Sequence, residues 1–160
     1  MGVGEVHLLY GLAGSGKTTL GHQLARRGPA VRFTLDEWMI QLYPDLAFDD
    51  PAYGQRAEVV KDIIWSVAEQ VLRTGTDVVL DWNSWSRERR AWTLERARSL
   101  RARVTVHCLQ TSAVESSARA DNRAEEGTSY AHRVTRDDNE HLAALMEPPS
   151  ETEGLRVVHE

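Results

Sequence analysis

The sequence contains a single cysteine, Cys108, among its 160 residues. One cysteine excludes an internal disulfide and a cysteine-rich metal site. Cys108 lies in the apolar run VTVHCLQ, so we expect a buried strand residue rather than a nucleophile. The chain also lacks an apolar run of the roughly 20 residues that span a bilayer, and its first residues do not resemble a secretion signal. We therefore expect a cytoplasmic protein with no membrane partner.

Basic charge is also scarce in this sequence. The 19 Lys and Arg residues are outnumbered by 24 Asp and Glu residues, which gives a net charge of −5. Proteins that bind long nucleic acids gain most of their affinity by neutralising phosphates, so this balance argues against such a role. Lys17 and Lys61 are the only lysines, and the first of them lies in a glycine-rich segment.

Short β-rich runs alternate with longer amphipathic segments, a pattern typical of βα units around a parallel sheet. Hydrophobic residues make up 41% and charged residues 27%, a globular composition, and the length suits one domain. We therefore predict a single α/β domain over residues 1–160, with a five-stranded parallel sheet sandwiched by helices. The predicted strands are 5–10, 30–35, 77–81, 103–109 and 155–159.

Helix start signals lie between several of these strands. Asp50 precedes Pro51, which predicts a capped helix that runs to about Arg73 and ends before Gly75. A polar, glycine-containing break at about 124–134 predicts a small helical lid. Capping-box spacing predicts two further helix starts, at Ser112 with Glu115 and at Thr135 with Asp138.

The segment GLAGSGKT, residues 11–18, matches the phosphate-binding pattern GxxxxGK[ST]. Glycines allow the backbone N–H groups to face inward, and the following helix adds its positive N-terminus. We expect Lys17 to reach the β and γ phosphates and the Thr18 hydroxyl to bind Mg²⁺. The fold is therefore predicted to be a P-loop NTPase that binds ATP or GTP. Its predicted nucleotide-binding residues are Gly11, Leu12, Ala13, Gly14, Ser15, Gly16, Lys17, Thr18 and Thr19.

Two acids follow predicted strands, at the sheet edge where ligands of open α/β sheets collect. Asp81 follows an apolar run, as a Walker B acid does, and is the candidate second Mg²⁺ ligand. Asp36 is the candidate general base, which would accept the proton of an attacking hydroxyl. The two roles could be exchanged, and either acid could instead cap a helix.

Arg119 and Arg123 lie four residues apart, on one face of a helix leading into the predicted lid. Arginine stabilises the charge of a migrating phosphoryl group, so both are candidate catalytic residues. A solvated helix face is the alternative explanation in a chain rich in arginine.

Aromatic residues cluster near both acids. Trp38 follows Asp36 closely, and Trp82, Asn83 and Trp85 come directly after Asp81. We predict that Trp38, Trp82, Asn83 and Trp85 line the acceptor pocket together with Asp36, with core packing as the alternative for each tryptophan.

These motifs together resemble the small P-loop kinases of the group that contains polynucleotide 5′-kinase, zeta-toxin and chloramphenicol phosphotransferase, and a broad set of bacterial ATP-binding proteins. The resemblance covers nearly the whole chain and implies transfer of a γ-phosphoryl group to a hydroxyl. It supports Lys17 and Thr18 on nucleotide and metal, Asp36 as base, and Arg119 and Arg123 as lid arginines. The matching runs are GLAGSGKTTL, LDEWM, VVLDWNSWSRERR, the RxxxR of Arg119 and Arg123, VTRDD and MEPPSETE.

Three hypotheses for the activity follow. The first is a kinase for a small-molecule hydroxyl such as that of an antibiotic, a sugar nucleotide or a nucleoside. The second makes a nucleic-acid 5′-hydroxyl the acceptor; it is less favoured, because polynucleotide kinase has an arginine where Trp38 and Met39 follow Asp36-Glu37. The third is a nucleotide-dependent regulatory module that binds a partner and hydrolyses slowly.

Overall fold

The computed structural model describes residues 2–12, 14–82, 84–109 and 136–160. Within these ranges, five strands form one sheet in the order β2-β3-β1-β4-β5, and every neighbouring pair is parallel. The predicted five-stranded parallel sheet is confirmed. The strands are β1 Val6–Tyr10, β2 Ala30–Thr34, β3 Asp77–Asp81, β4 Val104–Cys108 and β5 Arg156–His159.

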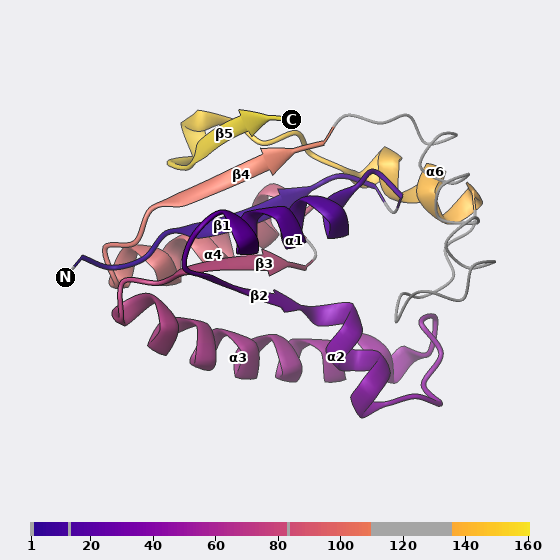
Figure 1. Cartoon of the computed structure of the whole chain (residues 1–160). Helices are drawn as coiled ribbons and strands as arrows, with labels where there is room; N and C mark the ends of the chain where they lie inside the picture. The colour runs from indigo at the N-terminus through magenta and orange to yellow at the C-terminus, as the bar shows by residue number, and fades with distance from the viewer. Residues whose placement is uncertain (1, 13, 83, 110–135) are drawn as a thin grey trace.

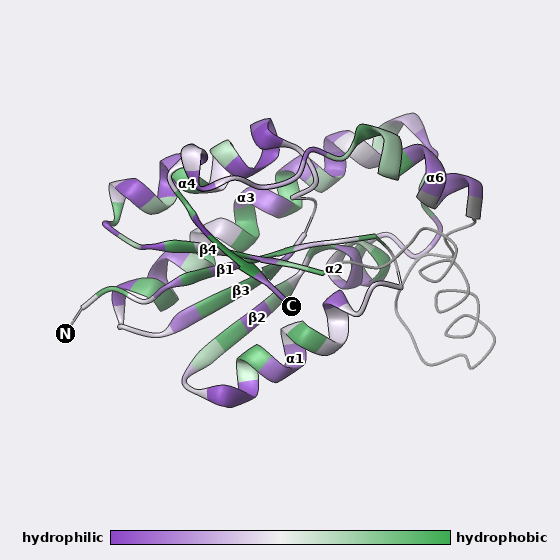
Figure 2. Ribbon diagram, turned by 90° about the horizontal axis from the view of Figure 1, so that it is seen from above, coloured by the Kyte–Doolittle hydropathy of each residue, from purple (hydrophilic) through white to green (hydrophobic). Residues whose placement is uncertain are grey.

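Helices cover both faces of this sheet. Figure 1 shows α1 on one face and α3 and α4 on the other, while α2 and α6 lie beyond the carboxyl ends of the strands. The view from above gives the same layers (Figure 2). The helices are α1 Lys17–Arg27, α2 Leu35–Leu42, α3 Pro51–Arg73, α4 Arg87–Ser99 and α6 Arg136–Leu145, and a 3₁₀ turn covers Glu151–Glu153.

Alternation along the strands divides the core between the two faces. Val6 and Leu8 of β1 belong to the larger cluster, which includes α3 and α4 residues, whereas Leu9 packs with Leu20 and Leu24 of α1. Hydrophobic residues accordingly gather on the strands between the two helix layers (Figure 2). The sheet therefore holds its strand ends in one row, and the loops that follow the strands start from this edge.

The long helix begins where its sequence predicts. The Asp50 carboxylate accepts a hydrogen bond of 2.8 Å from the Ala52 N–H, and Pro51 occupies the first turn. The second strand ends one residue earlier than expected, because Leu35 already belongs to α2. The expected helix starts at Ser112 and Thr135 and the lid at 124–134 lie outside the described residues.

Candidate active site

The loop between β1 and α1 is shaped by glycine. Gly14 and Gly16 have φ angles of 81° and 100°, in the left-handed region that other residues rarely adopt. The Ser15 N–H donates a 3.0 Å hydrogen bond to the Leu12 carbonyl, which closes a tight turn, and α1 begins at Lys17. The chain therefore presents a helix N-terminus and a lysine at the end of the central strand, an arrangement suited to an anion.

The residues of this loop are closely packed. A Cβ atom on Gly11 would lie 2.5 Å from the Ser15 Oγ, so any larger residue there would displace the Ser15 hydroxyl. Ser15 is 4% exposed, and among the described residues its hydroxyl has no hydrogen-bond partner. Leu12 and Gly14 are also buried, whereas Thr18 is half-buried and Thr19 exposed. A buried hydroxyl without a partner beside two left-handed glycines fits a loop that closes around a phosphate.

Asp81 ends β3 on the same face of the sheet as α1. Its side chain is 10% exposed. Burial raises the pKa of the Asp81 carboxyl; the charge of Lys17 opposes this shift, the charge of Asp36 adds to it, and Arg32 opposes it again. Lys17 and Asp36 are therefore both within electrostatic range of Asp81 at the carboxyl edge of the sheet. Asp81 does not cap a helix, since Ser86 caps α4.

Asp36 lies in the first turn of α2 and is exposed. Thr34 is the residue at the N-cap, so Asp36 is not the cap either. Burial raises the pKa of Tyr53, in the first turn of α3, and the charge of Asp36 raises it further. Asp36 is thus within electrostatic range of both Asp81 and Tyr53, and the sequence alone does not single out Tyr53.

Arg32 and Glu37 are two further charged residues at this edge, and neither of them has a role predicted from the sequence. The Arg32 guanidinium donates hydrogen bonds of 3.0 and 3.1 Å to the two carboxylate oxygens of Glu37, and another to the Thr34 hydroxyl. It also lies 3.9 Å from an Asp81 oxygen. The available signal was an arginine inside the apolar strand AVRFT, where a charge needs a partner.

Trp82 does not line an acceptor pocket, and that expectation is wrong. Successive strand residues face opposite sides, so Trp82 points away from Asp81 into the larger core cluster. It is 4% exposed and packs edge-on against Trp92, with ring centroids 5.7 Å apart. Core packing, the alternative considered for this residue, is what the structure shows.

Trp38 lies on the opposite side of α2 from Asp36. Residues two positions apart in an α-helix are separated by about 200° around its axis, so the side chains of Asp36 and Trp38 point in different directions. Trp38 lines a cavity of about 340 Å³ with Gln41 and Leu42 of α2 and Val60 and Ile63 of α3. The structure therefore does not bring Trp38 together with Asp36, and this cavity is separate from the phosphate loop.

Trp85 is half-buried in the loop before α4, with the Arg89 guanidinium 4.9 Å from its ring centre. Its carbonyl accepts a 2.8 Å hydrogen bond from the Glu147 N–H. Trp85 therefore supports the segment after α6. The expected contact of Trp85 with an acceptor stays a prediction.

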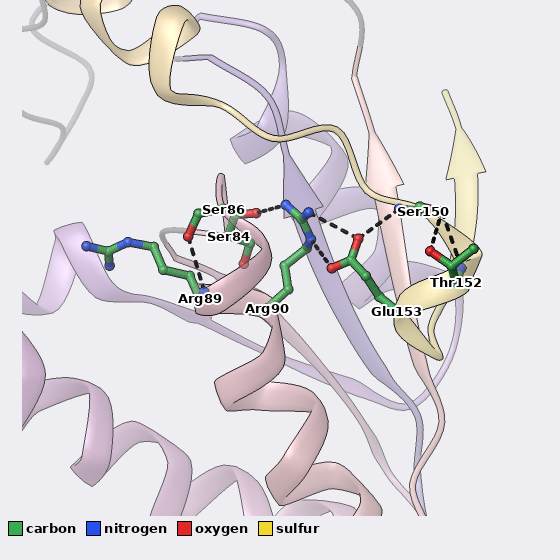
Figure 3. A network of polar contacts seen from close by, with 7 residues as sticks. All are labelled: Ser84, Ser86, Arg89, Arg90, Ser150, Thr152 and Glu153. Atoms are coloured by element: carbon green, nitrogen blue, oxygen red, sulfur yellow. Dashed lines mark hydrogen bonds and ion pairs between the residues drawn. The ribbon is translucent and has the colours of Figure 1, made fainter.

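The arginine-rich start of α4 has a structural role. Arg90 is 1% exposed and donates hydrogen bonds of 2.9 and 3.1 Å to Glu153 and one of 3.0 Å to the Ser84 carbonyl. Glu153 in turn accepts a bond from the Ser150 N–H (Figure 3). This network ties the RERR run to the tail segment PPSETE.

A second cavity, also of about 340 Å³, lies beside the phosphate loop on the β4–β5 side of the sheet. Gly11 and Leu12 form one wall, and Leu109, Met146 and Pro149 form others. Cys108 also lines it, but this thiol is 3% exposed and burial raises its pKa, as expected for a strand residue. The cavity offers an apolar space next to the anion-binding loop.

Several predicted site residues lie outside the described residues: Ala13, Asn83, Arg119 and Arg123. Among the residues that the structure describes, no three His, Cys, Asp or Glu side chains are grouped to hold a metal. The expected Mg²⁺ site is of another kind, because Thr18 and Asp81 would supply one hydroxyl and one carboxylate and water the rest. Oxygen donors of this kind are those that Mg²⁺ prefers. None of the described helices has the length and apolar character to cross a bilayer.

The sheet order, the glycine loop and the strand-end acid define a P-loop NTPase with a kinase-like fold. The chain belongs to the AAA_33 family, whose model, described as an AAA domain, matches residues 6–149. No curated protein sequence matches the chain.

Solved structures share this fold at low sequence identity. A chain of the Pnkp1/Rnl/Hen1 RNA repair complex matches with a TM-score of 0.72 and 20% identity, over 90% of this chain and 44% of that one. Kti12 of Chaetomium thermophilum, solved with ADP-AlF3, has a TM-score of 0.67 and 16% identity, over 96% and 88%. A gluconokinase from Sinorhizobium meliloti 1021 has a TM-score of 0.59 and 15% identity, over 99% and 84%. The present chain thus spans less than half of the first of these.

Proposed function

We propose that this protein is a Mg²⁺-dependent kinase that transfers the γ-phosphoryl group of ATP or GTP to the hydroxyl of a small molecule. The observation that carries the proposal is the glycine loop that ends at Lys17, next to strand β3, whose last residue Asp81 is within electrostatic range of Lys17 and Asp36. A loop of this kind binds the phosphates, and the two acids beside it supply the remaining groups that phosphoryl transfer to an alcohol requires. The kinases among the structural neighbours support this reaction class.

Each residue has a defined part in this reaction. The loop amides and the Lys17 ammonium hold the β and γ phosphates, and Thr18 and Asp81 hold the metal ion. Mg²⁺, when bound, neutralises charge that develops on the phosphate oxygens. The acceptor oxygen attacks the γ-phosphorus, the bond from that phosphorus to the β–γ bridging oxygen breaks, and the acceptor proton passes to Asp36. The predicted lid arginines, Arg119 and Arg123, would stabilise the migrating group.

Donor and acceptor have separate approaches in this proposal. The loop follows the central strand β1, with β4 and β5 on one side and β3 and β2 on the other. The cavity bounded by Leu12, Leu109 and Met146 adjoins the loop on the first side and suits the nucleoside. Asp36 and Tyr53 lie on the other side, where we place the acceptor. An antibiotic, a sugar nucleotide or a nucleoside would supply the hydroxyl.

The direct test is incubation of the protein with γ-labelled ATP and a library of hydroxyl compounds. We expect one compound class to become labelled, and Asp36→Asn to abolish labelling while nucleotide affinity stays within about twofold. Asp45→Asn is the matched control, since Asp45 lies in the exposed loop after α2. Transfer to water alone, unchanged in Asp36→Asn, would contradict the kinase proposal and favour a regulatory NTPase.

A nucleic-acid 5′-hydroxyl is the second candidate acceptor, because the RNA repair complex is among the similar structures. Labelled oligonucleotides distinguish the two acceptors. This candidate requires binding whose affinity falls as salt rises, followed by labelling of the 5′ end. Absence of both at low salt would remove it without affecting the small-molecule proposal.

A further inference from the structure

Arg32 is an unusual residue for its position, a nearly buried cation within the second strand. Its side chain is 13% exposed. The guanidinium forms close hydrogen bonds with both Glu37 oxygens and with Thr34, whereas its nearest approach to Asp81 is 3.9 Å. Arg32 is therefore hydrogen-bonded to Glu37, although a second carboxylate lies within reach.

The strand register explains why both acids are within reach. Thr34 pairs with Asp81 between β2 and β3, and Arg32 precedes Thr34 by two residues, so all three lie on one face of the sheet. Glu37 enters from the first turn of α2, directly after the strand. The Arg32 guanidinium thus lies between two carboxylates, that of Asp81 on β3 and that of Glu37 on α2.

Of these two acids, Glu37 accepts hydrogen bonds from Arg32, whereas Asp81 lies at 3.9 Å and keeps its oxygens for a metal ion. An arginine nitrogen that donates to both oxygens of a carboxylate, as in the Arg32–Glu37 pair, occupies the oxygens that Mg²⁺ needs. Lys17 also acts on Asp81, but the proposed role of Lys17 draws it to the phosphates. Arg32 is then the cation that competes for Asp81.

We propose that Glu37 is a positioning residue that holds Arg32 away from Asp81 and so keeps this carboxylate available to Mg²⁺. The inference rests on the metal site of the proposed function and adds a residue to it. It differs from a purely structural role, in which the Arg32–Glu37 pair only ties α2 to the sheet. In that case removal of either partner has the same effect, and removal of both is no better.

Nucleotide binding with and without metal tests the inference and needs no acceptor. The measured quantity is the ratio of the ADP dissociation constant in EDTA to that in excess Mg²⁺, determined with the full chain. Glu37→Gln should lower this ratio by at least about threefold, because Arg32 then moves to Asp81. Arg32→Gln should keep or raise the ratio, and the double variant should recover the wild-type ratio or exceed it.

Matched controls separate this effect from lost folding. Glu69 and Arg73 form a 2.7 Å surface ion pair on α3, so Glu69→Gln and Arg73→Gln should leave the ratio unchanged. Thermal unfolding of each variant reports the structural contribution separately. If Glu37→Gln does not fold, Arg32→Gln decides alone: a ratio at or above the wild type supports the inference, and a lower ratio overturns it.

The outcomes also distinguish this inference from the proposed function. A double variant as poor as Glu37→Gln, or a wild-type ratio in Glu37→Gln, overturns the role of Glu37 and leaves the kinase proposal standing. No effect of Mg²⁺ on ADP binding by the wild type overturns the metal site and, with it, the inference. The kinase proposal itself is tested separately, by labelling of an acceptor, and the ADP-binding measurements do not replace that test.

Discussion

Arg90 and Glu153 form a buried, two-bond ion pair between segments 63 residues apart, with distances of 2.9 and 3.1 Å. The pair joins the start of α4 to the turn before β5 (Figure 3). The Arg90 guanidinium also lies 5.8 Å from the centre of the Tyr10 ring at the end of β1. Arg90 therefore connects the central strand, helix α4 and the turn before the edge strand β5.

Removing one member of this pair should destabilise the domain strongly. Arg90→Met leaves the Glu153 carboxylate buried without its cation, which costs about 3–5 kcal/mol of unfolding free energy. The double variant Arg90→Met, Glu153→Gln should lose less than the sum of the two single variants, because no unpaired charge remains. Urea unfolding measures all three. Additive losses would show that the two side chains do not act as a pair.

The same pair should make the free energy of unfolding depend on pH in the acidic range. Burial raises the pKa of Glu153, but hydrogen bonds from Arg90 and Ser150 and the Arg90 charge outweigh it, so the net pKa lies below 4.5. The folded state then binds this proton more weakly than the unfolded state. The stabilisation is complete above pH 4.5 and is lost as the pH falls through the folded pKa. In Glu153→Gln, unfolding free energy against pH should be flatter in this range; an unchanged slope would exclude Glu153 as its source.

His107 should contribute a second pH dependence at a higher range. Burial lowers its pKa from 6.5, although its 2.7 Å hydrogen bond to Glu160 acts in the opposite direction. His7, 3.0 Å away on β1, also disfavours the charged form. The unfolded state therefore binds the proton more tightly, and stability should fall as the pH drops below 6.5. His107→Gln should remove this part of the slope, and thermal unfolding at pH 7.5 and 5.5 (about one unit on either side of the ordinary pKa) measures it.

Lys61 is a buried cation whose charge should reduce stability. It is 4% exposed, and its ammonium lies 4.2 Å from the Trp92 ring centre and 5.4 Å from that of Trp82. Burial lowers the pKa of Lys61. Lys61→Met keeps the shape without the charge and should raise unfolding free energy by about 1 kcal/mol at neutral pH.

The gain should shrink toward pH 10.5, where the amine is neutral in a growing share of both states. Lys61→Ala is the contrasting variant and should lose about 2 kcal/mol through the cavity that it leaves. Equal effects of Met and Ala would contradict this explanation.

Two glycines should respond to alanine in opposite ways. Gly11→Ala places a methyl group 2.5 Å from the Ser15 Oγ, so nucleotide affinity should fall by about tenfold or more as the loop distorts. Gly54 lies in the first turns of α3, where an added methyl group would have no other atom within 4 Å, and Gly54→Ala should stabilise the protein by about 0.5–1 kcal/mol. Fluorescence titration with a nucleotide and thermal unfolding measure the two effects. Normal nucleotide binding by Gly11→Ala would contradict the proposed fit of the loop.

Local signals predicted the local structure well. Alternating apolar runs predicted the five strands, and Asp50-Pro51 predicted the start of α3, because these features depend on neighbours in the chain. The glycine pattern likewise predicted the loop at residues 11–18. The motif alone does not contain the sheet order, which brings Asp81 of β3 next to this loop.

The directions and partners of side chains that depend on the folded arrangement were not predictable in the same way. The sequence places Trp82 beside Asp81, but strand alternation sends the two side chains to opposite faces. In the sequence Arg90 is one of a run of basic residues. Its partner Glu153 can be identified only from the structure, in which the tail packs against α4. The Arg32–Glu37 pair required a knowledge of where β2 ends and α2 begins.

The divergence of Asp36 and Trp38 around α2 has a consequence for how this protein can evolve. One flank of this short helix carries Asp36, within electrostatic range of Asp81, and the other carries Trp38, which packs against Phe33 and lines the cavity shared with α3. Changes on the second flank can accumulate without disturbing the first. A saturation scan of α2 should therefore return two interleaved sets of positions, one intolerant and one permissive, repeating with the helical turn.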